Sequence, residues 1–90
     1  MKRHFSILVS GRVQGVFYRA SAKAKAEELG ITGFVENLPD GNVYIEAEGT
    51  DQDLDRFKTW CAEGPPRSQV VRVEIKEGAL QNFTSFGIHR

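Results

Sequence analysis

Cysteine is nearly absent from this sequence of 90 residues, and neither sign of charge is in excess. The single cysteine, Cys61, cannot form an internal disulfide, which favours a reducing compartment such as the cytoplasm. Twelve Lys and Arg residues balance twelve Asp and Glu residues, so the chain as a whole does not attract nucleic acid or an anionic membrane strongly. Any site for an anion must therefore be local.

Long hydrophobic runs are also missing. The N-terminus is basic, but the apolar stretch that follows, residues 5–9, is too short for the core of a secretory signal. No stretch approaches the length of a membrane-spanning helix. With 40% hydrophobic residues, the chain is expected to form one compact domain, residues 1–90, around a single core.

Strands are predicted where apolar and polar residues alternate, which happens in residues 5–9, 43–47 and 71–75. Residues 31–37 are a further strand candidate, separated from the next by the turn residues 38–42. Residues 83–88 are short enough to form a terminal edge strand.

Two helices are predicted between these strands. Residues 17–29 are rich in Ala, Lys, Arg and Glu, and Gly30 is placed to end that helix. Thr50 can cap a second helix, which ends at residues 64–66. Its apolar stripe includes Phe57, Trp60 and Cys61, which favours a buried structural thiol over a nucleophile.

The resulting order is βαββαβ with a possible fifth strand. Two helices with one apolar stripe each bury it best on the same face of a single sheet. The fold class is therefore predicted as α+β, a ferredoxin-like sandwich with an antiparallel sheet of four or five strands and two helices on one face.

A loop of glycines and polar residues, residues 10–19, joins the first strand to the first helix. Backbone amides in such a loop can converge near the positive end of the helix and bind an anion. Arg19 would lie in the first helical turn, where its guanidinium can bind two phosphate oxygens. The loop is not a Walker loop, because no Gly-Lys-Ser/Thr follows. Spacing alone also fits an ordinary connection with a solvated arginine.

Asn37 ends the second predicted strand, just before the turn that contains Gly41. Its amide group both donates and accepts hydrogen bonds, so it could orient a water molecule while it holds a substrate. Taken alone, an asparagine before a Pro-Asp-Gly turn is more typical of a plain turn former.

Two patches of sequence resemble the signatures of the acylphosphatase family. Residues 11–19, Gly-Arg-Val-Gln-Gly-Val-Phe-Tyr-Arg, are similar to its signature loop. Residues 33–37, Gly-Phe-Val-Glu-Asn, with Gly41, Val43 and Gly49 in register, are similar to a second family pattern. Glu36 departs from that pattern, where the family more often has a basic or neutral residue, and its side chain should point away from that of Asn37.

The resemblance implies a function and a set of site residues. The chain is expected to hydrolyse acyl phosphates to a carboxylate and inorganic phosphate, with Arg19 and Asn37 as catalytic residues. Asn37 would position the attacking water. The phosphate-binding residues implied are Arg12, Val13, Gln14, Gly15, Val16, Phe17, Tyr18 and Arg19.

No cofactor and no metal are expected, because the reaction needs mainly positioning and charge stabilisation. His4 and His89 lie outside both signatures, so the substrate phosphate is expected to accept the proton of water. The predicted partners are a small acyl phosphate as substrate and phosphate as product, with no nucleic acid and no membrane. A monomer is the default expectation.

Three alternatives remain from the sequence. The chain also resembles the acylphosphatase-like N-terminal module of larger carbamoyl-transferring maturation proteins, although its length favours a free-standing enzyme. An RNA-binding domain is disfavoured, because residues 42–48 are acidic and carry one aromatic residue. A module that binds anions without turnover would be expected to lack Arg19 or Asn37, and both are present.

Overall fold

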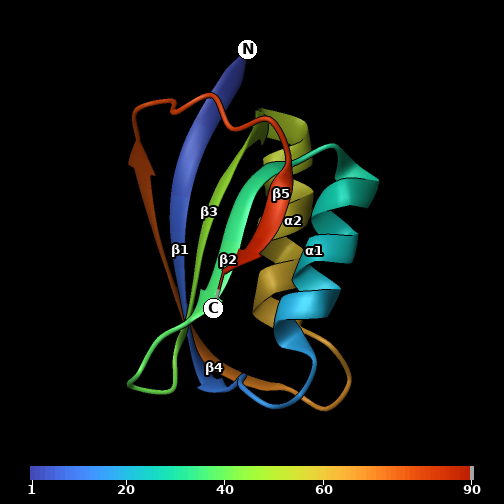
Figure 1. Cartoon of the computed structure of the whole chain (residues 1–90), viewed down its shortest axis with the longest axis vertical. Helices are drawn as coiled ribbons and strands as arrows, with labels where there is room; N and C mark the ends of the chain where they lie inside the picture. The colour runs from blue at the N-terminus through green and yellow to red at the C-terminus, as the bar shows by residue number, and fades with distance from the viewer. Residues whose placement is uncertain (90) are drawn as a thin grey trace.

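Five strands and two helices make up the fold (Figure 1), which we describe from a computed structural model covering residues 1–89. The helices are α1 (Tyr18–Leu29) and α2 (Asp51–Glu63). The strands are β1 (Lys2–Arg12), β2 (Thr32–Asn37), β3 (Val43–Thr50), β4 (Gln69–Gly78) and β5 (Phe86–His89). The predicted βαββαβ order is confirmed, and so is the additional fifth strand.

The strands form one sheet in the order β4-β1-β3-β2-β5. The pairs β1–β3, β1–β4 and β2–β3 are antiparallel. Both ends of β1 extend beyond the predicted residues 5–9, because Lys2 pairs with Thr50 of β3 and Arg12 pairs with Gln69 of β4. Pairing with β3 thus extends the start of the strand, and pairing with β4 extends its end, beyond the residues that alternate.

The prediction of an antiparallel sheet is wrong for the fifth strand, because β5 pairs with β2 in parallel. The physical reason is the short connection that precedes it. β4 ends beside the start of β1, where Gly78 pairs with His4, and residues 79–85 then cross to the far edge at the same end of the sheet (Figure 1). β5 must therefore run away from that end, in the direction of β2.

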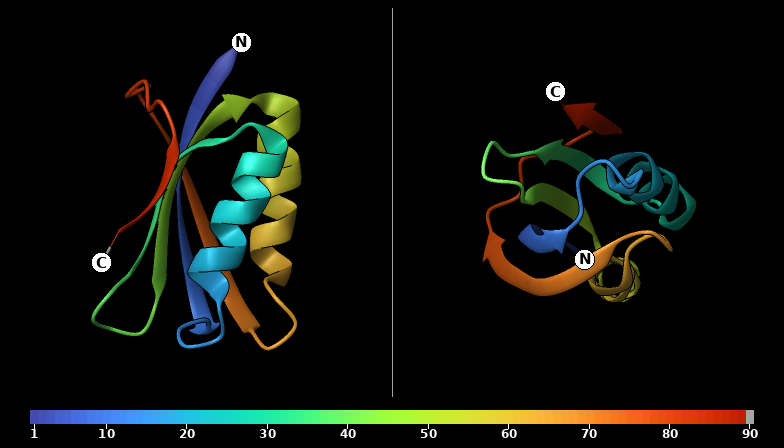
Figure 2. Two further views of the ribbon diagram at one scale, coloured as in Figure 1. Left: turned by 45° about the vertical axis from the view of Figure 1, so that its right-hand side comes forward. Right: turned by 90° about the horizontal axis from the view of Figure 1, so that it is seen from below.

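Both helices cover one face of the sheet, as predicted, and the left view of Figure 2 shows them side by side on that face. Gly30 ends α1 in the left-handed region with φ of +72°. Thr50 caps α2, because its Oγ1 accepts a hydrogen bond from the Asp53 amide at 3.2 Å. Neither helix of the described chain has both the length and the apolar character that crossing a bilayer requires.

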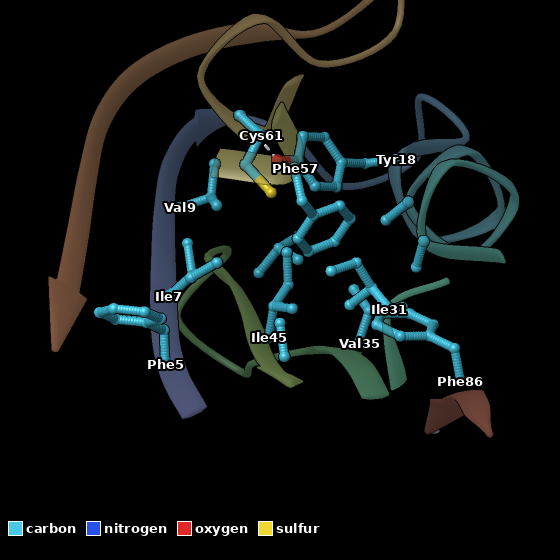
Figure 3. Close-up of a cluster of buried hydrophobic side chains, with 14 of the residues drawn as sticks. Phe5, Ile7, Val9, Tyr18, Ile31, Val35, Ile45, Phe57, Cys61 and Phe86 are labelled. Carbon is cyan, nitrogen blue, oxygen red and sulfur yellow. Dashed lines mark hydrogen bonds between the residues drawn. The ribbon is translucent and has the colours of Figure 1, made fainter. Parts of the chain in front are cut away.

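The core lies between the helices and the inner face of the sheet (Figure 3). Alternate residues of β1 and β3 point into it, and α2 contributes Leu54, Phe57 and Cys61. Burial raises the pKa of the Cys61 thiol to about 12, so it stays protonated at neutral pH. The prediction of a buried structural thiol is confirmed.

Candidate functional site

The loop between β1 and α1 is anchored by two buried valines. Val13 and Val16 place their side chains in the core. Gly15 lies between them with φ of +71°, and a Cβ atom added there would meet no other atom within 4 Å. The two valines thus attach the loop to the core, while its backbone at Gly15 faces open space.

The N-terminus of α1 carries no side-chain cap. Phe17 occupies the N-cap position and provides no side-chain hydrogen bond, and the first turn contains no acidic residue. The first amides of a helix have no partner within the helix, and they carry the positive end of its dipole. This end of α1 is therefore available to an anion.

A cleft of about 690 Å³ opens at this helix end. It joins the loop and the first turn of α1 to the C-terminal end of β2 and to β5, which are far apart in the sequence. The residues that line it are Val13, Gly15, Phe17, Tyr18, Arg19, Ala20, Asn37 and Ile88. Arg19 and Asn37, which the sequence analysis selected from two separate patches, thus lie at the same cleft.

Asn37, which lines the cleft, carries an acceptor without a partner among the described residues. Its Oδ1 atom is buried and has no hydrogen-bond partner among the described residues. Leaving such a group unpaired costs about 1–3 kcal/mol. The amide group can satisfy this acceptor by binding a water molecule or a ligand that enters the cleft.

Arg19 extends from the first turn of α1 towards β5, where its Nη1 donates to the His89 carbonyl oxygen at 3.2 Å. None of the ion pairs found within residues 1–89 involves Arg19. The bond to β5 directs the guanidinium, and its remaining N–H groups can donate to an anion.

Three residues of the predicted phosphate-binding loop do not line the cleft. Arg12 is exposed and pairs with Gln69 at the end of β1. The side chain of Val16 is buried in the core. The Gln14 side chain faces the β2–β3 turn, where its Nε2 donates to the carbonyl oxygens of Leu38 and Asn42, both at 2.8 Å. Gln14 therefore ties the loop to the turn that follows Asn37.

Sequence reasoning missed two lining residues, Ala20 and Ile88. Phe86 is buried, and Ile88 is two positions further along β5, so the alternation of the strand was a usable signal. The location of Ile88 beside β2 depends on the parallel β2–β5 pairing, which pairs it with Val35. That pairing could not be read from the pattern.

The remaining titratable groups lie elsewhere. His4 is buried on the outer face of the sheet, where its Nδ1 lies 2.8 Å from Glu48 Oε2. The His89 ring stacks on Phe34 at a centroid distance of 4.1 Å. Neither imidazole lines the cleft. Within residues 1–89, no cluster of three or more His, Cys, Asp or Glu side chains has a geometry that could hold a metal ion.

Comparisons with known proteins agree with the two sequence signatures. The family model described as acylphosphatase matches residues 5–88. An acylphosphatase of Methylococcus capsulatus is 50% identical over 91 residues, a match that covers 100% of this chain and 98% of that protein. The structure of an acylphosphatase from Coxiella burnetii has a TM-score of 0.95 and 38% identity, covering 98% of this chain and 93% of the other.

One further similarity concerns a larger protein. The crystal structure of full-length HypF in its phosphate- and nucleotide-bound form matches with a TM-score of 0.90 and 26% identity, and the match covers 100% of this chain but 12% of that one. The relative from Methylococcus capsulatus, which matches over 98% of its own length at 50% identity, is an acylphosphatase. Together with the family model, this similarity establishes that the chain belongs to the acylphosphatase family.

Proposed function

We propose that this acylphosphatase uses the loop of residues 12–19, Arg19 and Asn37 to hydrolyse the carboxyl–phosphate anhydride bond of acyl phosphates. Backbone amides of the loop and of the first turn of α1 bind the phosphoryl oxygens, and the Arg19 guanidinium holds them. Asn37 orients the water molecule that attacks phosphorus. The products are a carboxylate and inorganic phosphate.

The observation that supports this proposal most strongly is that Asn37, whose Oδ1 has no hydrogen-bond partner among the described residues, lines the same cleft as Arg19. A water molecule that donates one hydrogen to this oxygen removes the cost of the buried acceptor. The Nδ2 group of the same amide is left to donate to a phosphoryl oxygen. One side chain thus brings the nucleophile and the electrophile together.

The reaction balances without a protein base. The water oxygen forms a bond to phosphorus while the bond from phosphorus to the bridging oxygen breaks, and the carboxylate leaves with that electron pair. The proton of the water passes to a non-bridging phosphoryl oxygen. A carboxylate is a good leaving group, so positioning and charge stabilisation supply most of the required rate.

The first test measures hydrolysis of benzoyl phosphate by purified protein in the presence of a chelator. It compares wild type with the variants R19A and N37A. We expect each variant to lose about 10²- to 10³-fold in kcat, because each removes a donor or a water ligand from the transition state. R56A is the matched control, because Arg56 lies in α2 outside the cleft. Circular dichroism checks that each variant is folded.

An inactive wild type that still binds inorganic phosphate would instead identify a module that binds anions without turnover. Full activity of N37A would contradict the role of Asn37 in orienting water. Loss of activity with the chelator, restored by one divalent ion, would contradict a mechanism without metal.

The same mechanism predicts a flat pH profile. The described residues that line the cleft include no His, Cys, Asp or Glu, and burial raises the pKa of the Tyr18 hydroxyl, so it stays protonated. We expect kcat to change less than about twofold between about pH 5.5 and 7.5. A bell-shaped profile with a limb at about pH 6.5, the pKa of an ordinary histidine, would contradict this mechanism.

We further propose that residues 1–90 form a single acylphosphatase domain that acts as a monomer in the cytoplasm and binds no nucleic acid. The buried free thiol of Cys61 supports a reducing compartment. The balanced charge supports the absence of nucleic acid as a partner. Light scattering of the purified protein tests the monomer, with a mass of 10.1 kDa expected.

A further inference from the structure

Phe17 is exposed at the surface, and binding of phosphate by the backbone amides of the loop does not explain why an aromatic side chain lies there. Its side chain is 73% exposed, whereas those of its neighbours Val16 and Tyr18 are buried. Its backbone has φ of +64°, in the left-handed region that aromatic residues rarely adopt. The loop thus holds a large aromatic side chain outside the core, beside the cleft.

Ile88 provides a second exposed apolar side chain at the same cleft. It is 37% exposed and comes from β5, at the opposite end of the chain. Single exposed apolar residues are common on protein surfaces and need no explanation. Phe17 and Ile88 come from distant parts of the sequence and line the same cleft as Arg19 and Asn37, so both can contact one bound ligand.

The cleft has more room than a phosphoryl group needs, and few of the described residues that line it are charged. Its volume of about 690 Å³ lies in the range of sites that hold whole small molecules. Arg19 is the one charged residue among the described residues that line it. If Arg19 binds the phosphoryl group, no second cation among the lining residues within residues 1–89 is left for an acyl group that carries its own negative charge.

We propose that Phe17 and Ile88 form the acyl subsite of this enzyme, and that the subsite selects acyl phosphates with an uncharged, apolar acyl group, above all an aromatic one. This inference rests on the proposed function, because it takes the phosphoryl group to be bound by the loop and Arg19. A planar acyl group packs on the Phe17 ring while its carbonyl remains attached to the bound phosphoryl group.

The test is the ratio of kcat/KM for benzoyl phosphate to kcat/KM for acetyl phosphate. Wild type is compared with F17A, F17Y and I88A, and L80A is the control, since Leu80 is 45% exposed and lies outside the cleft. Comparing this ratio between variants cancels the different intrinsic reactivities of the two substrates. Succinyl phosphate, whose acyl group carries a carboxylate, is the third substrate.

We expect F17A to lower the ratio about tenfold and I88A to lower it about threefold, mainly through a higher KM for benzoyl phosphate. F17Y should keep the wild-type ratio because it keeps the ring, and L80A should keep it because it leaves the cleft unchanged. Succinyl phosphate should be a poorer substrate of wild type than benzoyl phosphate.

Two failures are distinguishable. If F17A and I88A hydrolyse both substrates with an unchanged ratio, or lose activity on both equally, the acyl subsite is wrong while the proposed function stands. If wild type hydrolyses none of the three acyl phosphates, the proposed function fails and the subsite fails with it.

Discussion

Gly33 lies in β2 with φ of +142°, and no other residue fits at its position. A Cβ atom there would collide with the backbone carbonyl oxygen of Glu46 in β3. The Gly33 amide also donates to the Ser85 carbonyl oxygen at 2.9 Å, which connects β2 to the segment that leads into β5. The family signature that begins with this glycine therefore has a steric basis in the sheet.

We expect G33A to lower the free energy of unfolding by more than about 2 kcal/mol, because the added methyl group clashes with backbone and the backbone angle is strained. Urea denaturation measures this loss. G87A is the matched control, since Gly87 is also a strand residue and a Cβ atom there meets nothing within 4 Å. Equal stabilities of G33A and G87A would contradict the steric explanation.

At the scale of elements, the catalytic loop and the β2–β3 turn are joined through Gln14. Its Nε2 donates to the carbonyl oxygens of Leu38 and Asn42, which flank the turn directly after Asn37. Leu38, which accepts one of these bonds, directly follows Asn37, whose side-chain amide is proposed to hold the water. We therefore expect Gln14 to act as a positioning residue that holds the loop of residues 12–19 near Asn37.

We expect Q14A to lower kcat/KM for benzoyl phosphate about tenfold, because the loop and Asn37 are then less accurately placed. Q14E should lower it at least as much, since its carboxylate faces two carbonyl oxygens and cannot donate to them. Q52A, in the exposed first turn of α2, is the control. Wild-type kcat/KM in Q14A would show that the turn stays in place without this contact.

Element types followed from the sequence because periodicity and capping residues are local properties. Thr50 and Gly30 delimit helices as their residue types predict. The position of β5 at the edge beside β2 could not be predicted from the sequence, since alternation identifies a strand but not its neighbour in the sheet. Ile88 was therefore missed at the cleft, whereas Asn37 and Arg19 were found because each lies in a local signature.

At the scale of the whole molecule, a buried polar cluster attaches the β4–β5 connection to the outer face of the sheet. Glu48 of β3 accepts hydrogen bonds from the backbone amides of Gln81 and Phe83 and contacts the imidazole of His4. Glu46 lies 3.3 Å from the other nitrogen of the same ring. The burial of His4 and Glu48 could not be predicted from the alternation of apolar and polar residues, because it depends on the connection that crosses the outer face of the sheet.

This cluster predicts how stability depends on pH. Burial acts to raise the pKa of Glu48, but the amides of Gln81 and Phe83 and the His4 imidazole outweigh it, so the pKa lies below its usual value of 4.5. The unfolded chain then binds a proton more readily than the folded one. Glu48 therefore stabilises the fold fully above about pH 4.5, and this contribution is lost as the pH falls through the lowered pKa of the folded state.

We expect E48Q to be less stable than wild type by about 2 kcal/mol at pH 7, because a neutral amide replaces a charged acceptor of several hydrogen bonds. The difference should begin to shrink below about pH 4.5, where Glu48 of the unfolded wild-type chain takes up a proton, and shrink further as the pH falls through the lowered pKa of folded Glu48. Urea denaturation from pH 7 to about 3 measures both stabilities. E28Q is the control, since Glu28 is exposed and pairs with Lys25 on the surface of α1. If the stability difference between E48Q and wild type stays constant over this pH range, the charge of Glu48 does not hold the β4–β5 connection. The shape of the side chain alone would then explain its effect on stability.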